Sequence, residues 1–244
     1  MAADRAARYL RGMSGRRPLA VLFDLDGTLI DTIELLLSSV RHAFRGRTER
    51  VPTEAEWIAG IGTPLVAQLR PYSANDAELD ELVTGYRLYQ REHHDRLTRL
   101  FDGALEVVTT LRERGHPVAV VTSKGDEIAQ RSIEYVGLAP YVDTLVGCDS
   151  CVRHKPDPEP VRVALDRLGY APSEAMFVGD SPHDMASGRA AGVVTVGALW
   201  GPFTRAMLQP TTPDHYLERI TELPALVERV ERGARERLVR QETN

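Results

Sequence analysis

Five short apolar runs recur along this chain, and most of them end in acidic, glycine or hydroxyl residues. They are LAVLFDLDG at 19–27, PVAVVTS at 117–123, VDTLVG at 142–147, AMFVGD at 175–180 and VVTVGA at 193–198. Short, almost wholly apolar runs are typical of strands that are buried on both faces of a parallel sheet. Segments with helical spacing separate most of them; Ala104, Val108 and Leu111, for example, share one predicted helix face. The alternation predicts an α/β fold with right-handed crossovers and a doubly wound, Rossmann-like parallel sheet.

One long segment, residues 32–100, does not fit this alternation. It lacks a buried strand and instead contains four helical patterns, IELLLSSVRHAF, TEAEWIAG, TPLVAQLR and DAELDELVTGYRLYQREHH. A connection of roughly seventy residues is too long for a plain loop, so we expect an inserted helical cap domain over the carboxyl edge of the sheet. The predicted organisation is an N-terminal extension (1–18), a core domain (19–31 and 101–244) and the cap (32–100). We expect the tail from residue 214 to begin as a helix.

Composition and charge narrow the class of protein. The chain has 244 residues, of which 43% are hydrophobic and 27% charged, as in soluble globular proteins, and its net charge of -5 argues against a general nucleic-acid surface. No apolar run approaches the roughly 20 residues that span a bilayer, and the N-terminus lacks the apolar core of a signal peptide. We therefore expect a cytoplasmic protein with neither a membrane nor a nucleic acid as partner, of undetermined oligomeric state.

The two cysteines, Cys148 and Cys151, are spaced C-x-x-C. Two thiols cannot complete a four-coordinate zinc site, and although His154 is close, no fourth ligand is evident. A redox pair is an alternative, but the sequence context of a thioredoxin-like motif is missing. We favour two small residues at a strand end and loop, without a chemical role.

Acidic residues gather where the predicted strands end, at the edge where open α/β sheets bind their ligands. Asp24 and Asp26 follow the first run, and Asp180 follows the fourth. Residues two apart on a strand share a face, so bare carboxylates there would repel unless one is protonated or a cation lies between them. Mg²⁺ fits, because it takes few protein ligands together with waters and a substrate phosphate. For Asp31 we favour a turn or helix-capping role.

Lysine is rare in this chain, since 28 of its 30 basic residues are arginines and only Lys124 and Lys155 are lysines. Lys155 lies in the KPDP stretch, where two prolines stiffen the loop after the third predicted strand. A lysine supplies a compact positive charge that can lie beside both a metal and a carboxylate, whereas arginine presents a wide planar fork. Lys155 is therefore predicted to neutralise a transferring phosphoryl group and to keep a nucleophilic acid ionised. Lys124 is either near the phosphate or simply solvated.

Small and hydroxyl residues at the same edge could bind phosphate oxygens. Gly27 and Thr28 permit a tight turn whose N–H groups can face a phosphate. Thr122 and Ser123 can donate hydroxyl or backbone hydrogen bonds to the same oxygens.

Histidines offer a second candidate metal site, which we do not favour. His93, His94 and Asp95 are adjacent, and adjacent side chains on a helix diverge, so we expect them on a solvated cap surface. His183 is expected at the start of a helix, without a catalytic role.

Four motifs in this order resemble those of the haloacid dehalogenase superfamily. DLDGTLID resembles its first motif, VVTSK its second, KPDP its third and VGDSPHD its fourth, and the helical insert lies where the C1 cap of that family lies. The resemblance covers residues 19 to about 226. It implies a fold of that family, in which a Rossmann-like core carries the cap.

The resemblance also implies roles for individual residues, position by position. Asp24 would attack phosphorus to form an aspartyl-phosphate, and Asp26 would protonate the leaving group and later activate water. Thr122 and Lys155 would bind the phosphoryl oxygens. A Mg²⁺ ion would be held by Asp24, the backbone carbonyl of Asp26 and Asp180. Ser181 and Asp184 would contact the metal-binding residues without binding the metal themselves.

Within the superfamily, the sequence favours phosphoryl transfer to water. The second acid of DLDGT, which dehalogenases lack, is present as Asp26, and the cap has no lysine to form the Schiff base of phosphonate hydrolases. The closest likeness is to phosphoglycolate phosphatases and, among these, to PpaX-like inorganic pyrophosphatases. Gly62, Thr63 and Pro64 would form the cap loop that reaches a small phosphorylated substrate. A sugar-phosphate mutase on the same scaffold remains the alternative.

Overall fold

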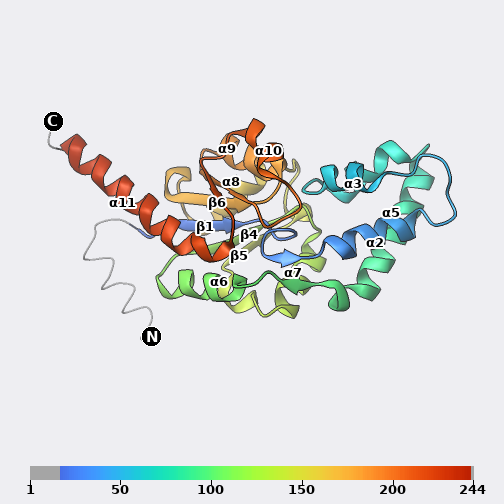
Figure 1. The fold of residues 1–244 in the computed structure, drawn as a ribbon, viewed down its shortest axis with the longest axis horizontal. Coiled ribbons are helices and arrows are strands. Elements are labelled where there is room, and N and C mark those ends of the chain that lie inside the picture. Colours follow the sequence, from blue (N-terminus) through green and yellow to red (C-terminus); the bar gives the residue numbers. More distant parts are fainter. Residues whose placement is uncertain (1–16, 243–244) are drawn as a thin grey trace.

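The computed structural model describes residues 17–242, with side chains described to residue 233. Its main sheet has six parallel strands in the order β5-β4-β1-β6-β7-β8 (Figure 1). The strands are β1 (Ala20–Phe23), β4 (Val118–Val121), β5 (Thr144–Val146), β6 (Ala175–Gly179), β7 (Val194–Ala198) and β8 (His215–Leu217). The chain winds from β1 outward to β4 and β5, then returns to β6 on the other side of β1. The strand order thus reverses at β1, which confirms the predicted doubly wound α/β sheet.

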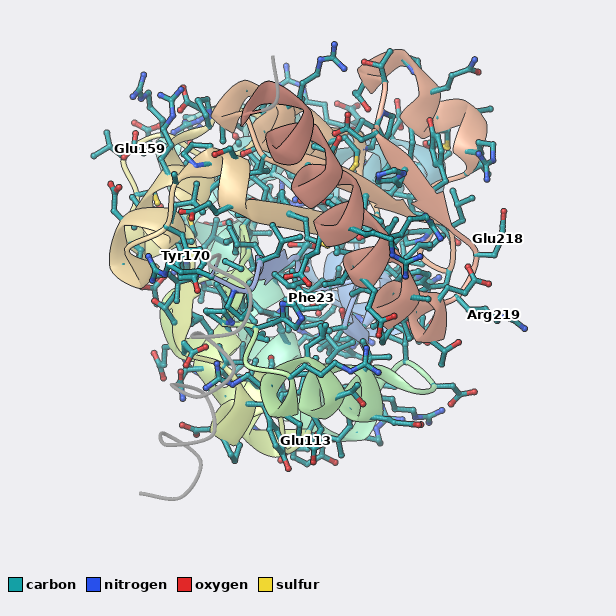
Figure 2. The ribbon with its side chains drawn as sticks, turned by 90° about the vertical axis from the view of Figure 1, so that its left-hand side faces the viewer. Phe23, Glu113, Glu159, Tyr170, Glu218 and Arg219 are labelled. Carbon is teal, nitrogen blue, oxygen red and sulfur yellow. The ribbon has the colours of Figure 1, made fainter. Side chains whose placement is uncertain are left out.

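The alternation of side chains along β1 produces a separate apolar core on each face of the sheet. Val21 and Phe23 point to one face and Ala20 and Leu22 to the other, and all four are fully buried. Figure 2 shows Phe23 enclosed between α11 and α6, while Glu113, Glu218 and Arg219 lie at the surface. A strand buried on both faces explains why its sequence is apolar without interruption.

Helices cover both faces of this sheet. On the face of Phe23 lie α6 (Ala104–Glu113), α7 (Asp126–Tyr135) and α11 (Leu223–Glu242). On the opposite face lie α8 (Glu159–Leu168) and α9 (Pro182–Ala191). Besides these elements and the helices and strands of the segment 30–100 given below, the chain has α10 (Arg205–Leu208) and the 3₁₀ turns η1 (Arg70–Tyr72), η2 (Asp95–Leu97), η3 (Ala139–Tyr141), η4 (Cys148–Ser150), η5 (Pro172–Glu174), η6 (Gln209–Thr211) and η7 (Ile220–Glu222).

The segment 32–100, called the cap below, is helical as expected. Its helices are α2 (Ile33–Ala43), α3 (Glu54–Gly60), α4 (Leu65–Leu69) and α5 (Asp76–His93). At its two ends β2 (Ile30–Asp31) pairs antiparallel with β3 (Arg99–Leu100), so the chain leaves and re-enters the core at one place. Figure 1 shows α2, α3 and α5 together at one end of the sheet, with α11 at the opposite end.

The cap has its own apolar core, which continues into the rest of the molecule. Leu82 and Tyr86 of α5 belong to one buried cluster with Trp57 of α3. Met185 of α9 and Phe203, which precedes α10, belong to the same cluster. Apolar burial therefore holds the cap against the carboxyl edge of the sheet.

The expected helix at the start of the tail is wrong. His215–Leu217 forms β8, the sixth strand, which pairs with β7 at the edge of the sheet. Three residues are too few to show the apolar periodicity of a strand, and the helix of the tail begins only at Leu223. Within residues 17–242, no helix is both long and apolar enough to cross a membrane. Most of the predicted extension, residues 1–16, lies outside the described residues.

Two leucines of α5 provide a matched test of the cap core. Leu82 is 1% exposed and Leu88 is 59% exposed on the same helix. Leu82→Ala should lower the free energy of unfolding by about 2–5 kcal/mol, because it removes buried methyl groups and leaves a cavity. Leu88→Ala should change it by less than about 0.5 kcal/mol. Urea unfolding of both variants measures the difference, and equal effects would contradict the assignment of this face.

Candidate active site

Three neighbouring strands deliver polar side chains to one point at the carboxyl edge of the sheet. Asp24 directly follows β1, Thr122 follows β4 and Asp180 follows β6. The backbone N–H of Asp24 donates to Val178 O at 2.9 Å, so the β ladder fixes the position of this residue. All three side chains are buried. The strand order therefore brings together residues that lie far apart in the sequence, at the switch point where such sheets bind ligands.

Lys155 lies at the centre of this group. Its ammonium donates to Asp24 Oδ1 and to Asp184 Oδ1, both at 2.6 Å, and the residue is only 2% exposed. Burial by itself would lower the pKa of Lys155, but Asp184 and Asp24 outweigh it and raise the pKa above its ordinary value. A permanently charged ammonium is thus fixed between two carboxylates. The predicted pairing of Lys155 with a nucleophilic acid matches this geometry.

Asp184 is positioned by the start of α9. Ser181 is the N-cap of this helix, and both its N–H (3.0 Å) and its hydroxyl (2.6 Å) donate to Asp184 Oδ2. The capping box satisfies N–H groups that the helix leaves without partners. Both carboxylate oxygens of Asp184 are therefore engaged, one by Ser181 and one by Lys155.

Asp24, Asp180 and Asp184 form a buried acidic cluster, with one oxygen from each lying within 4.8 Å of the others. Burial, and next the charge of Asp184, raise the pKa of Asp24 to about 7 although Lys155 opposes them. Burial, and next the charge of Asp24, raise the pKa of Asp180 well above its ordinary value. Thr28 donates to Asp180 Oδ1 at 2.9 Å, whereas Asp180 Oδ2 is buried without a hydrogen-bond partner. The cluster therefore holds more negative charge than its protein partners neutralise.

Two glycines leave room around the unpartnered oxygen. A Cβ atom on Gly27 would lie 2.6 Å from Asp180 Oδ2, and one on Gly201 would lie 2.7 Å from it. Gly27 also has a φ of +89°, which favours glycine. Its N–H donates to Ile30 O at 2.8 Å and that of Thr28 to Leu25 O, so the turn itself uses the donors that we expected to face a phosphate. The evident role of Gly27 is to admit Asp180.

The donor set of this cluster fits a divalent cation such as Mg²⁺. Carboxylate oxygens are the ligands that this ion prefers. Oδ2 of Asp180 is buried without a partner, and the pKa of the neighbouring Asp24 is raised. A cation bound between these two groups would therefore neutralise charge that the protein leaves uncompensated. Asp24 and Asp180 are the best-placed ligands, because Asp184 already has protein donors on both oxygens.

Asp26 lies beside the acidic cluster but has different partners. Its Oδ1 accepts from the ammonium of Lys124 at 2.6 Å and from the hydroxyl of Thr32 at 2.5 Å. The Lys124 side chain is 4% exposed, which excludes the solvated alternative. Asp31 is exposed and its Oδ1 accepts from the N–H of Ile33 (3.3 Å), which is the turn contact that we expected as one alternative, whereas the N-cap of α2 is Thr32. Both lysines of the chain are thus paired with acids of the DLDGT motif.

The cap loop reaches the same edge of the sheet. The hydroxyl of Ser123 donates to Gly62 O at 2.6 Å, so it contacts the loop and not only a prospective phosphate. A Cβ atom on Gly62 would lie 2.7 Å from Ser181 Oγ, and the φ of +97° also requires glycine. Thr63 donates to Gly60 O at 2.8 Å, and Pro64 is the N-cap residue of α4.

A pocket of about 370 Å³ lies between the cap and the core. From the core it is lined by the acids and phosphate-binding candidates at the strand ends, including Asp24, Asp26, Thr122, Ser123 and Lys124. From the cap it is lined by the loop 62–64 and by side chains of α3, α4 and α5. The predicted cap loop therefore faces the same cavity as Asp24, Asp26 and Thr122, whereas Lys155 and Asp180 lie behind its lining.

One histidine expectation is wrong. His94 is fully buried, with Nε2 at 2.8 Å from Ser132 Oγ and Nδ1 at 2.7 Å from Asp95 Oδ1, so it joins the end of the cap to α7. Burial lowers its pKa. His183 lies in the first turn of α9, as expected.

The cysteines are free and half-buried, and burial raises the pKa of both thiols. They are therefore protonated at neutral pH. Cys148 lines the pocket, where burial and the charges of Asp149 and Asp126 outweigh the opposing effect of Arg87 on its pKa.

Sequence reasoning missed two contributors to the site. The hydroxyl of Thr32 donates to the carboxylate of Asp26. In the sequence, only its position two residues after the DLDGTLI stretch could have indicated this contact. Gly201 lies in a loop 21 residues after Asp180, and nothing in its local sequence indicates contact with that acid. Both contacts depend on tertiary structure.

Comparison with known proteins supports the geometric reading. The family profile of haloacid dehalogenase-like hydrolases matches residues 21–198. The chain is 37% identical to the pyrophosphatase PpaX of Bacillus velezensis over 212 residues, which cover 86% of this chain and 97% of that protein. It is 36% identical to the pyrophosphatase PpaX of Bacillus pumilus over 208 residues, covering 85% and 95%.

Solved structures share the fold. The crystal structure of a predicted phosphoglycolate phosphatase from Haemophilus somnus matches with a TM-score of 0.79 and 22% identity, covering 86% of this chain and 98% of that one. A predicted phosphatase from Clostridium acetobutylicum matches with a TM-score of 0.77 and 24% identity, covering 87% and 100%. The chain belongs to the haloacid dehalogenase-like hydrolase family, as the family profile and the PpaX relatives show.

Proposed function

We propose that this hydrolase is a Mg²⁺-dependent phosphohydrolase that works through an aspartyl-phosphate on Asp24, with pyrophosphate or 2-phosphoglycolate as its substrate. The observation that carries the proposal is the buried Asp24 carboxylate, fixed by Lys155 at 2.6 Å beside the unpartnered oxygen of Asp180. The names of the PpaX relatives, which are pyrophosphatases, support the phosphohydrolase class. We expect it to act in the cytoplasm.

The first chemical step uses the free oxygen of Asp24. Lys155 binds Oδ1, so Oδ2 is the oxygen that attacks phosphorus while the bond from phosphorus to the leaving oxygen breaks. Asp26 gives its proton to the leaving oxygen. The ammonium of Lys155 and the hydroxyl of Thr122 offset the charge on the transferring oxygens. When bound to Asp24 and Asp180, Mg²⁺ would supply further positive charge for the same purpose.

The second step releases phosphate. Asp26 takes a proton from a water molecule, whose oxygen attacks phosphorus as the bond to Asp24 breaks. Lys124 and Thr32 hold Oδ1 of Asp26, which leaves Oδ2 for both proton transfers. The two acids therefore differ in role because their partners differ: Asp24 is fixed as an attacking carboxylate and Asp26 is placed to exchange protons.

The nucleophile can be tested with a matched substitution. Asp24→Asn should lower phosphate release by at least about 10³-fold, because an amide cannot form the phosphoenzyme. Asp31→Asn, at an exposed position in the same motif, should retain activity within about 2-fold. Both are measured by phosphate release with Mg²⁺ from pyrophosphate, 2-phosphoglycolate and β-glucose 1-phosphate.

The outcomes separate the alternatives. Retained turnover in Asp24→Asn would show that another residue is the nucleophile, and no turnover of any ester or anhydride by the unaltered chain would defeat the proposed function. Conversion of β-glucose 1-phosphate to glucose 6-phosphate, rather than to glucose, would identify a mutase.

Metal binding should depend on pH in a defined direction. The raised pKa values of Asp24 and Asp180 mean that the folded protein keeps protons that the unfolded chain loses above about pH 4. Without metal, these groups make stability fall as pH rises toward 7. Mg²⁺ binds their ionised forms and releases the protons. The Mg²⁺-induced rise in Tm should therefore grow between about pH 5 and about pH 8.

Thermal unfolding with and without Mg²⁺ at each pH measures this rise, and the difference removes contributions from distant groups. Asp180→Asn should lose the rise. An increase in Tm that does not change with pH, or one that persists in the variant, would place the metal elsewhere.

A further inference from the structure

The cap wall of the pocket carries polar groups that nothing in the protein binds. Tyr86 and Gln90 lie one turn apart on α5, so they share a helix face, and both line the pocket. They are 4% and 8% exposed. Among the residues whose side chains the structure describes, neither the Tyr86 hydroxyl nor the Gln90 amide has a hydrogen-bond partner. Neither group is among the buried polar atoms that lack a partner, so both reach the open space of the pocket, where a ligand can bind them.

The indole of Trp57 packs against Tyr86 on the same wall. The indole ring of Trp57 lies 5.7 Å from the ring of Tyr86, measured between centroids, and Trp57 also lines the pocket. Its Nε1 is buried without a partner. Burial and the nearby charge of Asp26 raise the pKa of Tyr86, so its hydroxyl keeps its proton and can donate. The Tyr86 hydroxyl therefore offers a hydrogen-bond donor close to Asp26, the proposed proton donor, whereas Trp57 Nε1 is closed off from the pocket.

Charge is distributed unevenly between the two sides of the pocket. The only charged cap residues that line it are Arg87 and Arg91, also one turn apart on α5. Both are exposed, and neither has an ion-pair partner among the described side chains. The core side carries both signs of charge: the acids Asp24, Asp26, Glu127 and Asp149 together with Lys124 and Arg131. Asp24 and Asp26 are paired with lysines. The cap side of the pocket thus presents positive charge and hydrogen-bond donors, and no acid.

We propose, on the basis of the function proposed above, that Tyr86, Gln90, Arg87 and Arg91 bind the leaving group, and that this group is a phosphate. A phosphate carries a charge of about −1.5 to −2 at neutral pH and presents three acceptor oxygens. Two guanidinium groups and two uncharged donors match that charge and that number of acceptors better than they match a single carboxylate. The site is therefore selective for pyrophosphate over 2-phosphoglycolate, and these four residues determine the selectivity.

The test compares substrates with different leaving groups. Tyr86→Phe, Gln90→Leu, Arg87→Met and Arg91→Met are assayed with pyrophosphate, 2-phosphoglycolate and 4-nitrophenyl phosphate, whose leaving group has no second acidic group. Each variant should lose kcat/KM about 10-fold more with pyrophosphate than with 4-nitrophenyl phosphate, mainly through KM, because a hydrogen bond to a charged group is lost. Tyr72→Phe and Arg96→Met, in the cap but outside the pocket lining, are the matched controls, and they should leave kcat/KM unchanged with all three substrates.

A binding measurement tests, without turnover, whether these cap residues bind a second phosphate. Methylenediphosphonate, a pyrophosphate analogue with a P–C–P link, is titrated calorimetrically into the full chain with Mg²⁺, and its Kd should rise about 10-fold in Tyr86→Phe and Arg87→Met. Equal losses with all three substrates, or an unchanged Kd, would overturn the proposal. If the unaltered chain hydrolyses none of the three substrates, the proposed function fails, and the titration still shows whether these residues bind a second phosphate.

Discussion

The ion pairs of Lys155 with Asp24 and Asp184 are the interaction on which the rest of the site depends. An ammonium at 2.6 Å from two carboxylates, all buried, is stable only if each charge is compensated, since removing one partner leaves an uncompensated charge in a poorly solvated interior. Three separate segments supply the groups: the end of β1, the KPDP loop and the first turn of α9. Their convergence requires the strand order of the sheet, so the fold and the charge arrangement depend on each other.

Arginine could not replace lysine at this position without a change of geometry. The guanidinium is planar and wide, whereas the ammonium is compact and directs three donors. Two of these donors point to Asp24 and Asp184. The same argument applies to Lys124, whose ammonium binds Asp26 inside the pocket wall. This explains why a chain rich in arginine retains lysine at two positions only.

The cap completes the chemistry that the core begins. The cap helices bury apolar side chains together with Met185 and Phe203, and this burial stabilises the cap at the sheet edge. Gly62 lies against Ser123 and Ser181, and its loop lines the same pocket as Asp24. In the proposed mechanism the core would supply the attacking and metal-binding carboxylates, while the cap would supply cations and donors for the leaving group. Such a division explains how one core can serve different substrates through changes in the cap.

Residues at strand ends were predictable from the sequence, whereas contacts between distant segments were not. The positions of Asp24, Thr122 and Asp180 follow from apolar runs that stop abruptly, because the carboxyl ends of parallel strands meet at one edge. The strand β8 was missed because an edge strand of three residues has no periodicity. Helical spacing could not reveal that His94 is buried, since its burial depends on the contact with α7. The sequence likewise could not predict that the Gly27 N–H donates to Ile30 O within its own turn, because this depends on the backbone conformation.

Anomalous diffraction from crystals of the full chain grown with Mn²⁺ in place of Mg²⁺ tests the central claim most directly. The account predicts one metal peak within about 2.2 Å of carboxylate oxygens of both Asp24 and Asp180, with Lys155 still bound to Oδ1 of Asp24. A cluster without a peak, or a metal that displaces Lys155 from Asp24, would contradict it.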